Sequence, residues 1–267
     1  MRNVQNSKNI QGILIIYFIE WQVSNYGFNS LTLGLILKKT NQKIMISNED
    51  QEDQIGNDHI GNVAQNPIRT DAFVLSDEEK IESIKKNVAQ ILETIGLDLT
   101  DDSIKGTPNR VAKMFVNEMF GGLHPSKKPG ASTFENNYHY GEMLVEKNIT
   151  VYSTCEHHLL PIIGRAHVAY ISNGRVIGLS KMNRIVDYYA KRPQVQERLT
   201  MQIVQELQEA LGTEDVACVI DAKHLCVNSR GIRDIESSTV TAEYGGQFKN
   251  EAKRKEFLTF LNLNTKF

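Results

Sequence analysis

Apolar residues recur at helical spacing early in the regular part of the chain. A capping box of Ser76 and Glu79 opens an amphipathic helix with one buried face, which ends at Gly96. Its apolar stripe comprises Ile81, Ile84, Val88, Ile91, Leu92 and Ile95. A second helix is predicted from Thr107, as N-cap, with Pro108 at the first helical position, to residues 121–122.

The pattern changes to strands after a surface loop that prolines and Gly130 predict over residues 124–137. Strands are predicted over 148–152, 164–171, 175–179, 215–222 and 238–244, with Asn173-Gly174 as a hairpin turn between the second and third. Helices are predicted over 182–191 and 195–211, where Pro193 ends one and starts the next, and from about residue 250. The order of elements predicts an α+β domain, whose four-strand sheet has open edges that oligomerisation would cover.

Residues 1–66 follow neither pattern, and we interpret them as an N-terminal extension and a disordered linker. The apolar run 10–19 follows Arg2 and Lys8 like a signal-peptide core, but no A-x-A-like cleavage site follows, and the run is shorter than the roughly 20 residues that span a bilayer. Residues 41–66 are rich in Asn, Gln, Asp and Glu. The hypothesis is that residues before about Met45 form an upstream extension that need not be translated. A dispensable ordered appendage is the alternative.

Composition sets outer limits on function. The chain has 267 residues, 40% of them hydrophobic and 23% charged, so it can bury a full core. A net charge of -2 argues against a general nucleic-acid or acidic-membrane binder and favours a small phosphorylated substrate met by locally gathered Lys and Arg. Three cysteines without a C-x-x-C motif indicate a reducing compartment, and we expect a cytoplasmic protein.

Two of the three cysteines lie beside histidines, in the clusters Cys155-Glu156-His157-His158 and His224-Leu225-Cys226. Cysteine and histidine are the side chains that zinc prefers, and three protein ligands would leave a fourth position for water. Taken singly, Cys and His residues such as these are more often ordinary core or surface residues than metal ligands. Spacing permits Cys155, His158 and Cys226 as ligands, with the other two histidines free to move protons, but it does not decide which histidine binds. Cys218 alternates within a strand and is expected to be a buried, inert thiol.

A basic group follows the predicted hairpin. Ser180 and Lys181 end its second strand, and Arg184 lies one turn into the next helix, so that two cations and a helix N-terminus form an anion site. Arg230 follows the second metal cluster. Chain proximity thus predicts positive charge at both clusters and a substrate with phosphates at one end and a reactive carbon at the other. The alternative is ordinary solvated surface charge.

Five ordered motifs together resemble the zinc-dependent GTP cyclohydrolase I family. They are TPNRVAKM at 107–114, CEHH at 155–158, GLSKMNR at 178–184, RPQVQERLT at 192–200 and HLC at 224–226, followed by Arg230-Gly231. The resemblance covers about Ser76 to the C-terminus and leaves the first seventy or so residues unmatched.

The resemblance implies a reaction. Family members hydrolyse GTP at C8 of the guanine ring, release formate and form 7,8-dihydroneopterin triphosphate, the first step toward folate or tetrahydrobiopterin. Cys155, His158 and Cys226 would bind zinc. His157 would act as a proton shuttle in ring opening, and His224 would assist at N7.

The resemblance also implies the substrate contacts and the assembly. Ser180 would help the sugar rearrangement, Glu197 with Gln196 beside it would anchor the guanine, and the triphosphate would contact Arg110, Lys181, Arg184 and Arg230. The implied fold is the tunnelling fold, an antiparallel sheet backed by two helices, at residues 124–267, after a helical part at 67–123. The implied assembly is a homodecamer with active sites at subunit interfaces.

Two rival functions require other ligand patterns. A zinc-dependent deaminase would carry His-x-Glu and Pro-Cys-x-x-Cys patterns, which this chain lacks. A non-enzymatic structural zinc or nucleotide-binding protein would need a fourth protein ligand, and His157 or His224 would have to supply it.

Overall fold

A five-stranded sheet organises the part of the chain that the computed structural model describes, residues 65–263. These residues belong to one unit, Asn62–Phe267. The apolar run 10–19, the proposed upstream extension and nearly all of the predicted linker lie outside the described residues.

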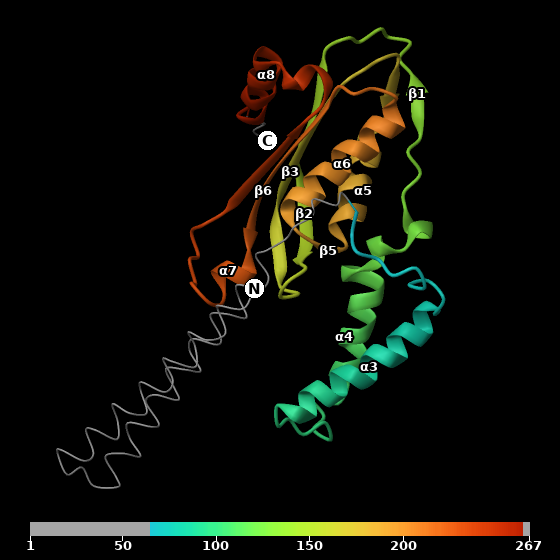
Figure 1. Cartoon of the computed structure of the whole chain (residues 1–267), viewed down its shortest axis with the longest axis vertical. Helices are drawn as coiled ribbons and strands as arrows, with labels where there is room; N and C mark the ends of the chain where they lie inside the picture. Colours follow the sequence, from blue (N-terminus) through green and yellow to red (C-terminus); the bar gives the residue numbers. More distant parts are fainter. Residues whose placement is uncertain (1–64, 264–267) are drawn as a thin grey trace, which may run out of the picture. The chain divides into compact units, whose positions relative to one another are not determined.

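Four strands of the sheet are antiparallel neighbours, and a two-residue strand extends one edge (Figure 1). The order is β5-β2-β3-β6-β7, and only β5 runs parallel to its neighbour. The bounds are β2 Met143–Cys155, β3 Pro161–Ile171, β5 Pro193–Gln194, β6 Val216–His224 and β7 Thr239–Tyr244. The predicted four-strand sheet is confirmed, although β2 begins earlier than the predicted strand at 148.

The predicted hairpin around Asn173-Gly174 is wrong. Gly174 does adopt a positive φ of 85°, but β4 (Arg175–Ile177) pairs with β1 (Thr133–Glu135) in a separate two-stranded sheet. Both edges of β3 are already occupied, by β2 and β6, so β3 has no free backbone groups for β4. The surface loop predicted over 124–137 therefore contains a strand, along with a short 3-10 helix at Pro125–Lys127.

Helices α5 (Leu179–Ala190) and α6 (Gln196–Leu211) pack on one face of the sheet (Figure 1). Alternate strand residues point to this face, and the core there joins Val151 and Ile220 to Ile185, Leu199 and Ile203. Two predicted boundaries move. Helix α5 begins at Leu179, so Ser180 and Lys181 lie in its first turn rather than at a strand end. Pro193 lies in β5 and does not start α6, whose N-cap is Val195.

The other face of the sheet is covered near one end by the C-terminal segment. A 3-10 helix at Gly246–Lys249 and helix α8 (Glu251–Leu261) contribute Phe248 and Phe257, which pack on Ala169, Ala217 and Val219. Asn250 caps α8 by accepting from the Ala252 amide. Among residues 65–263, no helix is long and apolar enough to cross a membrane.

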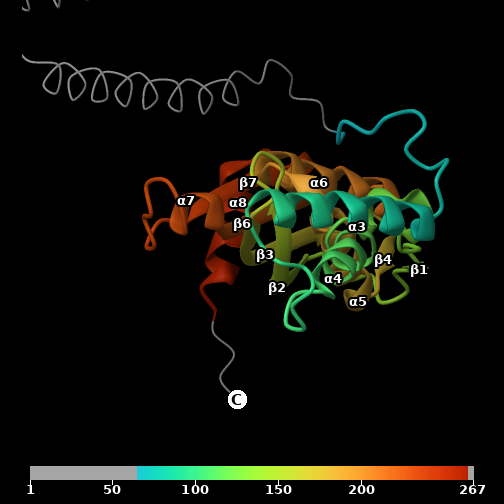
Figure 2. The same cartoon turned by 90° about the horizontal axis from the view of Figure 1, so that it is seen from below.

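The N-terminal part forms two helices that lie side by side (Figures 1 and 2). Helix α3 (Asp77–Thr94) has both bonds of the predicted capping box. Helix α4 (Thr107–Lys113) continues as a π-helix, Met114–Met119, and its N-cap is Gly106 rather than the predicted Thr107.

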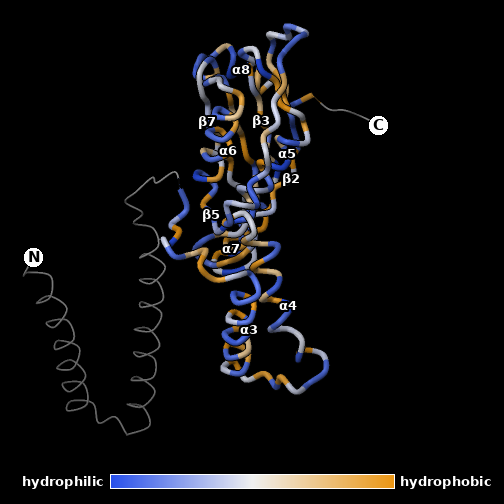
Figure 3. The backbone as a smooth tube through the Cα atoms, turned by 90° about the vertical axis from the view of Figure 1, so that its right-hand side faces the viewer, coloured by the Kyte–Doolittle hydropathy of each residue, from blue (hydrophilic) through white to orange (hydrophobic). Residues whose placement is uncertain are grey.

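The apolar stripe of α3 is only half-buried within one chain, and Ile91 and Ile95 are exposed. No residue of α3 is fully buried, and Ile91 is 60% exposed. Figure 3 shows hydrophobic positions recurring along α3 as they do in the sheet. The prediction of one buried face therefore holds only in part for the isolated subunit.

Candidate active site

The turn between β2 and β3, residues 155–160, carries the first predicted cluster and is called the metal turn below. Cys155 is the last residue of β2, and its amide donates to the Leu160 carbonyl at 2.8 Å. The Leu159 amide returns a bond to the Cys155 carbonyl at 2.9 Å, with Leu159 itself at a φ of 53°. The Glu156 amide donates to the Gln194 carbonyl of β5 at 3.0 Å. Backbone bonds thus close the metal turn and tie it to the edge strand.

The second cluster reaches the same end of the sheet because β6 pairs with β3. Ile162 is the partner of His224, so β6 ends beside the metal turn, and the short helix α7 (Leu225–Asn228) presents Cys226. One ligand atom from each of Cys155, His158 and Cys226 lies within 4.8 Å of the others. Ligands around a tetrahedral zinc are about 3.5–3.8 Å apart, given bond lengths of about 2.0–2.3 Å, so modest side-chain rotation fits the set to one ion.

The three ligands form an open group rather than a closed one. Within residues 65–263 the group contains no fourth Cys, His, Asp or Glu. His157 is nearby, with its Nδ1 atom 3.7 Å from the Cys155 sulfur. Cys155 is buried and His158 is exposed, so the open side faces the surface of the subunit. Cys218 is fully buried in β6, and burial raises the pKa of its thiol, as expected for an inert side chain.

Electrostatics favour a cation among these sulfurs. Burial, followed by the neighbouring Cys155 sulfur, raises the pKa of the Cys226 thiol to about 11. A bound metal ion would reverse that shift by stabilising the thiolates. Arg230 lies next to the group, and its Nη1 atom donates to His158 Nε2 at 2.9 Å. The predicted positive charge at the second cluster is therefore present.

His224 is held by a buried glutamine. The Gln196 Nε2 atom donates to the Ile220 carbonyl at 3.0 Å, the Thr239 carbonyl at 2.9 Å and Thr241 Oγ1 at 3.1 Å. These acceptors fix the amide orientation, so Gln196 Oε1 faces His224 Nε2 at 2.8 Å and must accept its proton. The neutral imidazole therefore carries its proton on Nε2 and has a lone pair on Nδ1.

The two residues at the start of α6 face different surroundings. Gln196, predicted to bind substrate, is 1% exposed and has its amide occupied by protein groups. Glu197 is exposed and accepts no hydrogen bond from the described residues. Burial lowers the pKa of His224, and the Glu197 carboxylate opposes that shift. Glu197 is thus the group at this position that remains available to a ligand.

The basic residues that are predicted to bind phosphate lie at the other end of the sheet. Asn183 Nδ2 donates to Glu146 Oε1 at 3.3 Å, which fixes the N-terminal end of α5, with Ser180, Lys181 and Arg184, near the start of β2. Cys155 ends the same strand nine residues after Glu146, about 30 Å away at strand rise. The predicted convergence of charge and metal ligands thus holds for Arg230 and fails for Lys181 within one subunit. Arg110 bonds Thr107 Oγ1 and the Ser103 carbonyl, both in the N-terminal part.

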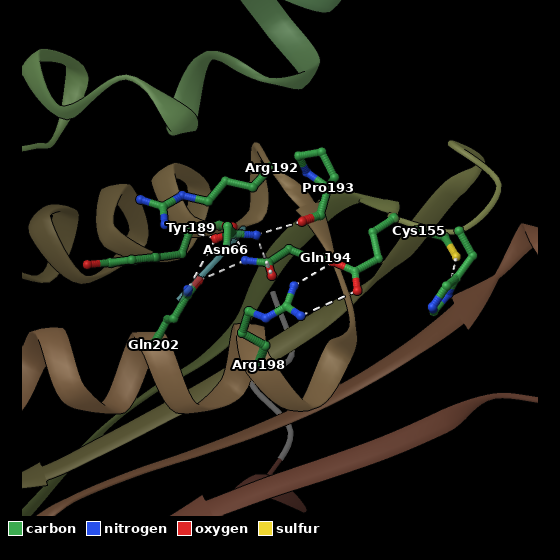
Figure 4. Close-up of polar contacts among 10 residues, drawn as sticks. Asn66, Cys155, Tyr189, Arg192, Pro193, Gln194, Arg198 and Gln202 are labelled. Atoms are coloured by element: carbon green, nitrogen blue, oxygen red, sulfur yellow. Dashed lines mark hydrogen bonds and ion pairs between the residues drawn. The ribbon is translucent and has the colours of Figure 1, made fainter. Parts of the chain in front are cut away.

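One pair at the site had no sequence prediction. Arg198 Nη1 and Nη2 donate to the two carboxylate oxygens of Glu156, at 2.5 and 3.3 Å (Figure 4). Both residues stand inside recognised motifs, and that placement is the only signal that could have found them.

The fold and the site define an α+β protein with three side chains that could hold a metal ion and two histidines beside them in sequence, an arrangement typical of metal-assisted hydrolases. The model of the GTP cyclohydrolase I family matches residues 84–262, and the chain belongs to this family. A protein of Flavobacterium johnsoniae named GTP cyclohydrolase 1 is 78% identical over 223 residues, which are 84% of this chain and 100% of that protein. Proteins of the same name from Vibrio campbellii and Aeromonas salmonicida are 54% and 53% identical, covering 69% and 70% of this chain and 85% and 86% of their own.

Proposed function

We propose that this protein hydrolyses GTP at C8 of the guanine ring, releases formate and forms 7,8-dihydroneopterin triphosphate, the first step toward folate or tetrahydrobiopterin. The observation that carries the proposal is the convergence of the three ligands with His157 and His224 at one end of the sheet. Membership in the GTP cyclohydrolase I family supplies the reaction.

Cys155, His158 and Cys226 are the residues that would hold the ion, and zinc suits two thiolates and an imidazole. Bound there, zinc would lower the pKa of a water at the fourth position to near neutrality. The open side of the group admits that water and C8 of the base. Arg230 contributes positive charge toward the triphosphate.

The two remaining histidines are assigned to proton transfer. His157 is exposed beside the Cys155 sulfur and shuttles a proton during ring opening. His224 exchanges a proton with N7 through Nδ1, because Gln196 occupies its Nε2 atom. Gln196 accordingly acts through His224, while the exposed carboxylate of Glu197 accepts the N–H groups of guanine.

The separation between the predicted phosphate-binding residues and the candidate metal ligands supports an active site shared between subunits. The N-terminal end of α5, which carries Ser180, Lys181 and Arg184, packs near Glu146, up to about 30 Å along β2 from Cys155, so a neighbouring chain would supply these residues. Ser180 would then assist the sugar rearrangement, and Arg110 would complete the triphosphate contacts. The half-buried stripe of α3 and the open edge of β7 give such neighbours apolar and backbone surfaces to cover.

The assembly that fits is the homodecamer of the tunnelling fold. The four antiparallel strands backed by α5 and α6 support this proposal. Residues 67–123 are its helical N-terminal part and residues 124–267 its tunnelling-fold part, whereas residues 1–66 are an extension. The family match, residues 84–262, falls inside this domain.

Subunit mixing tests the shared site. Purified Cys226→Ala and Lys181→Met proteins should each be nearly inactive, since one lacks a metal ligand and the other a phosphate contact. Dissociated and reassembled together in equal amounts, they should regain about a quarter of the wild-type release of formate, because that fraction of sites combines two intact halves. No recovery in a mixture shown to contain hybrid oligomers would contradict the shared site. Absence of formate and fluorescent pterin from zinc-loaded wild-type protein would contradict the reaction itself.

A further inference from the structure

We propose that the ion pair of Arg198 and Glu156 is a positioning clamp that holds the metal turn in its ligand geometry. The inference rests on the proposed metal site. It adds two residues that neither bind the ion nor touch the reacting atoms. Arg198 lies in the first turn of α6, and Glu156 lies between the ligands Cys155 and His158.

The geometry of the pair favours a structural role over a solvated contact. The Arg198 Nη1 atom donates to Glu156 Oε2 at 2.5 Å, and Nη2 donates to Oε1 at 3.3 Å. This is the fork geometry that arginine makes with carboxylates. The two side chains are 14% and 15% exposed. Every other ion pair among residues 65–263 has at least one side chain more than a third exposed. This pair is thus the best shielded from solvent.

The clamp adds a side-chain anchor to a turn whose two ends are fixed by backbone bonds and whose middle residues are exposed. Cys155 belongs to β2, and the Glu156 amide bonds to β5, but His157, His158 and Leu159 are exposed. His158 therefore depends on the orientation of the turn for its place in the ligand group. The side chain of Glu156 holds the turn from the side of α6, while Arg230 Nη1 contacts the His158 ring itself at 2.9 Å.

The strand behind the turn is itself rigidly held. Gln194 of β5 is fully buried, and its Nε2 atom donates to the Tyr189 carbonyl and to Gln202 Oε1, both at 2.9 Å (Figure 4). Asn66 Nδ2 donates to the Pro193 carbonyl at 2.7 Å. Because β5 runs directly into α6, the Gln194 carbonyl holds the Glu156 amide and the Arg198 fork holds the Glu156 side chain.

The clamp also links the metal to the proposed base site. One turn of α6 carries Gln196, which orients His224, then Glu197, and then Arg198. The same helical turn therefore sets the positions of the proton-transfer histidine, the guanine carboxylate and the metal turn relative to one another. Breaking the pair should loosen His158 while leaving Cys155 in its strand.

Cobalt binding tests the clamp without relying on activity. Metal-free full-length protein is titrated with Co²⁺, and the thiolate and ligand-field absorption bands report affinity and geometry. Arg198→Met should weaken Co²⁺ binding about 10–100-fold, the usual loss when a group that orients a metal ligand is removed, and should alter the ligand-field bands. Arg198→Lys keeps the charge without the fork and should fall between Arg198→Met and wild type.

Partner and control variants decide between outcomes. Glu156→Gln, which keeps the side-chain volume, should weaken Co²⁺ binding as Arg198→Met does. The double variant should bind Co²⁺ no more weakly than the single variant with the lower affinity. Arg69→Met removes an exposed ion pair with Asp71 and should match wild type.

Unchanged Co²⁺ affinity and bands in Arg198→Met would overturn the clamp while leaving the metal site intact. Additive losses in the double variant would also overturn it. Should Arg198→Met fail to fold, Glu156→Gln decides in the same way. Failure of the wild-type protein to bind Co²⁺ would instead refute the metal site, and with it the proposed function.

Discussion

Replacing Gln196 with leucine removes the buried amide that connects His224 to the sheet. Leucine has a similar volume, so the change deletes hydrogen bonds without opening a large cavity. The Ile220 and Thr239 carbonyls and the His224 imidazole each lose a partner, whereas Thr241 retains its bond to the Thr200 hydroxyl. At about 1 kcal/mol for each bond, the free energy of unfolding should fall by about 2–4 kcal/mol.

Urea unfolding at fixed protein concentration measures this change, and Gln205→Leu is the matched control. Gln205 lies on the same helix but is exposed and bonds only Glu209, so its replacement should cost less than about 0.5 kcal/mol. The kcat/KM for GTP should fall by up to about 100-fold in Gln196→Leu, because His224 loses its fixed orientation. Equal stability and equal activity in the two variants would refute the reasoning.

Three further predictions concern packing, pH and thiol reactivity. Gly164→Ala should lower stability by about 1–3 kcal/mol in thermal unfolding, since a Cβ there would lie 2.2 Å from a backbone oxygen of β6. Gly141→Ala is the control, because a Cβ at that position meets nothing within 4 Å. Equal unfolding temperatures of the two variants would contradict this prediction. Burial lowers the pKa of His167 from 6.5, so the free energy of unfolding is retained above about pH 6.5 and falls as the pH drops below it. His167→Gln should flatten this pH dependence in urea unfolding. An unchanged pH dependence would show that His167 is not its source. Alkylation of the folded metal-free protein should label Cys226 and spare Cys218, and rapid labelling of Cys218 would show that its strand opens.

Local signals predicted much of the fold correctly. The capping box at Ser76 and the end of α6 at Leu211 depend on neighbouring residues, so the sequence contains all the information they need. The candidate metal group was predicted from the family resemblance, because spacing alone permitted Cys155, His158 and Cys226 without deciding which histidine binds. Its members do come together in the structure.

Pairing between distant segments was not predictable in the same way. The Asn173-Gly174 turn forms, but the strand after it pairs with β1 because β3 has no free edge. The prediction from chain proximity, that Lys181 lies near the metal ligands, was wrong within one subunit for a related reason. Strand β3 runs away from the metal turn, so Lys181, which follows it, lies at the far end of the sheet, whereas Arg230 follows β6 as it returns to that turn.

The ion pair of Glu156 and Arg198 and the contacts of Gln196 were hidden for a different reason. Each joins residues 24 or more positions apart, and charged or amide residues at a helix start are usually solvated. Only the packing of α6 against the metal turn and β6 shows that they face protein groups.

Zinc content and formate release, measured on the same samples, test the central claim most directly. Wild-type protein and Cys218→Ala should each bind about one zinc ion per chain and release formate from GTP with a fluorescent pterin product, because Cys218 is buried away from the site. Cys226→Ala should lose both zinc and turnover. Stoichiometric zinc with full formate release in Cys226→Ala would contradict the ligand set and the mechanism built on it.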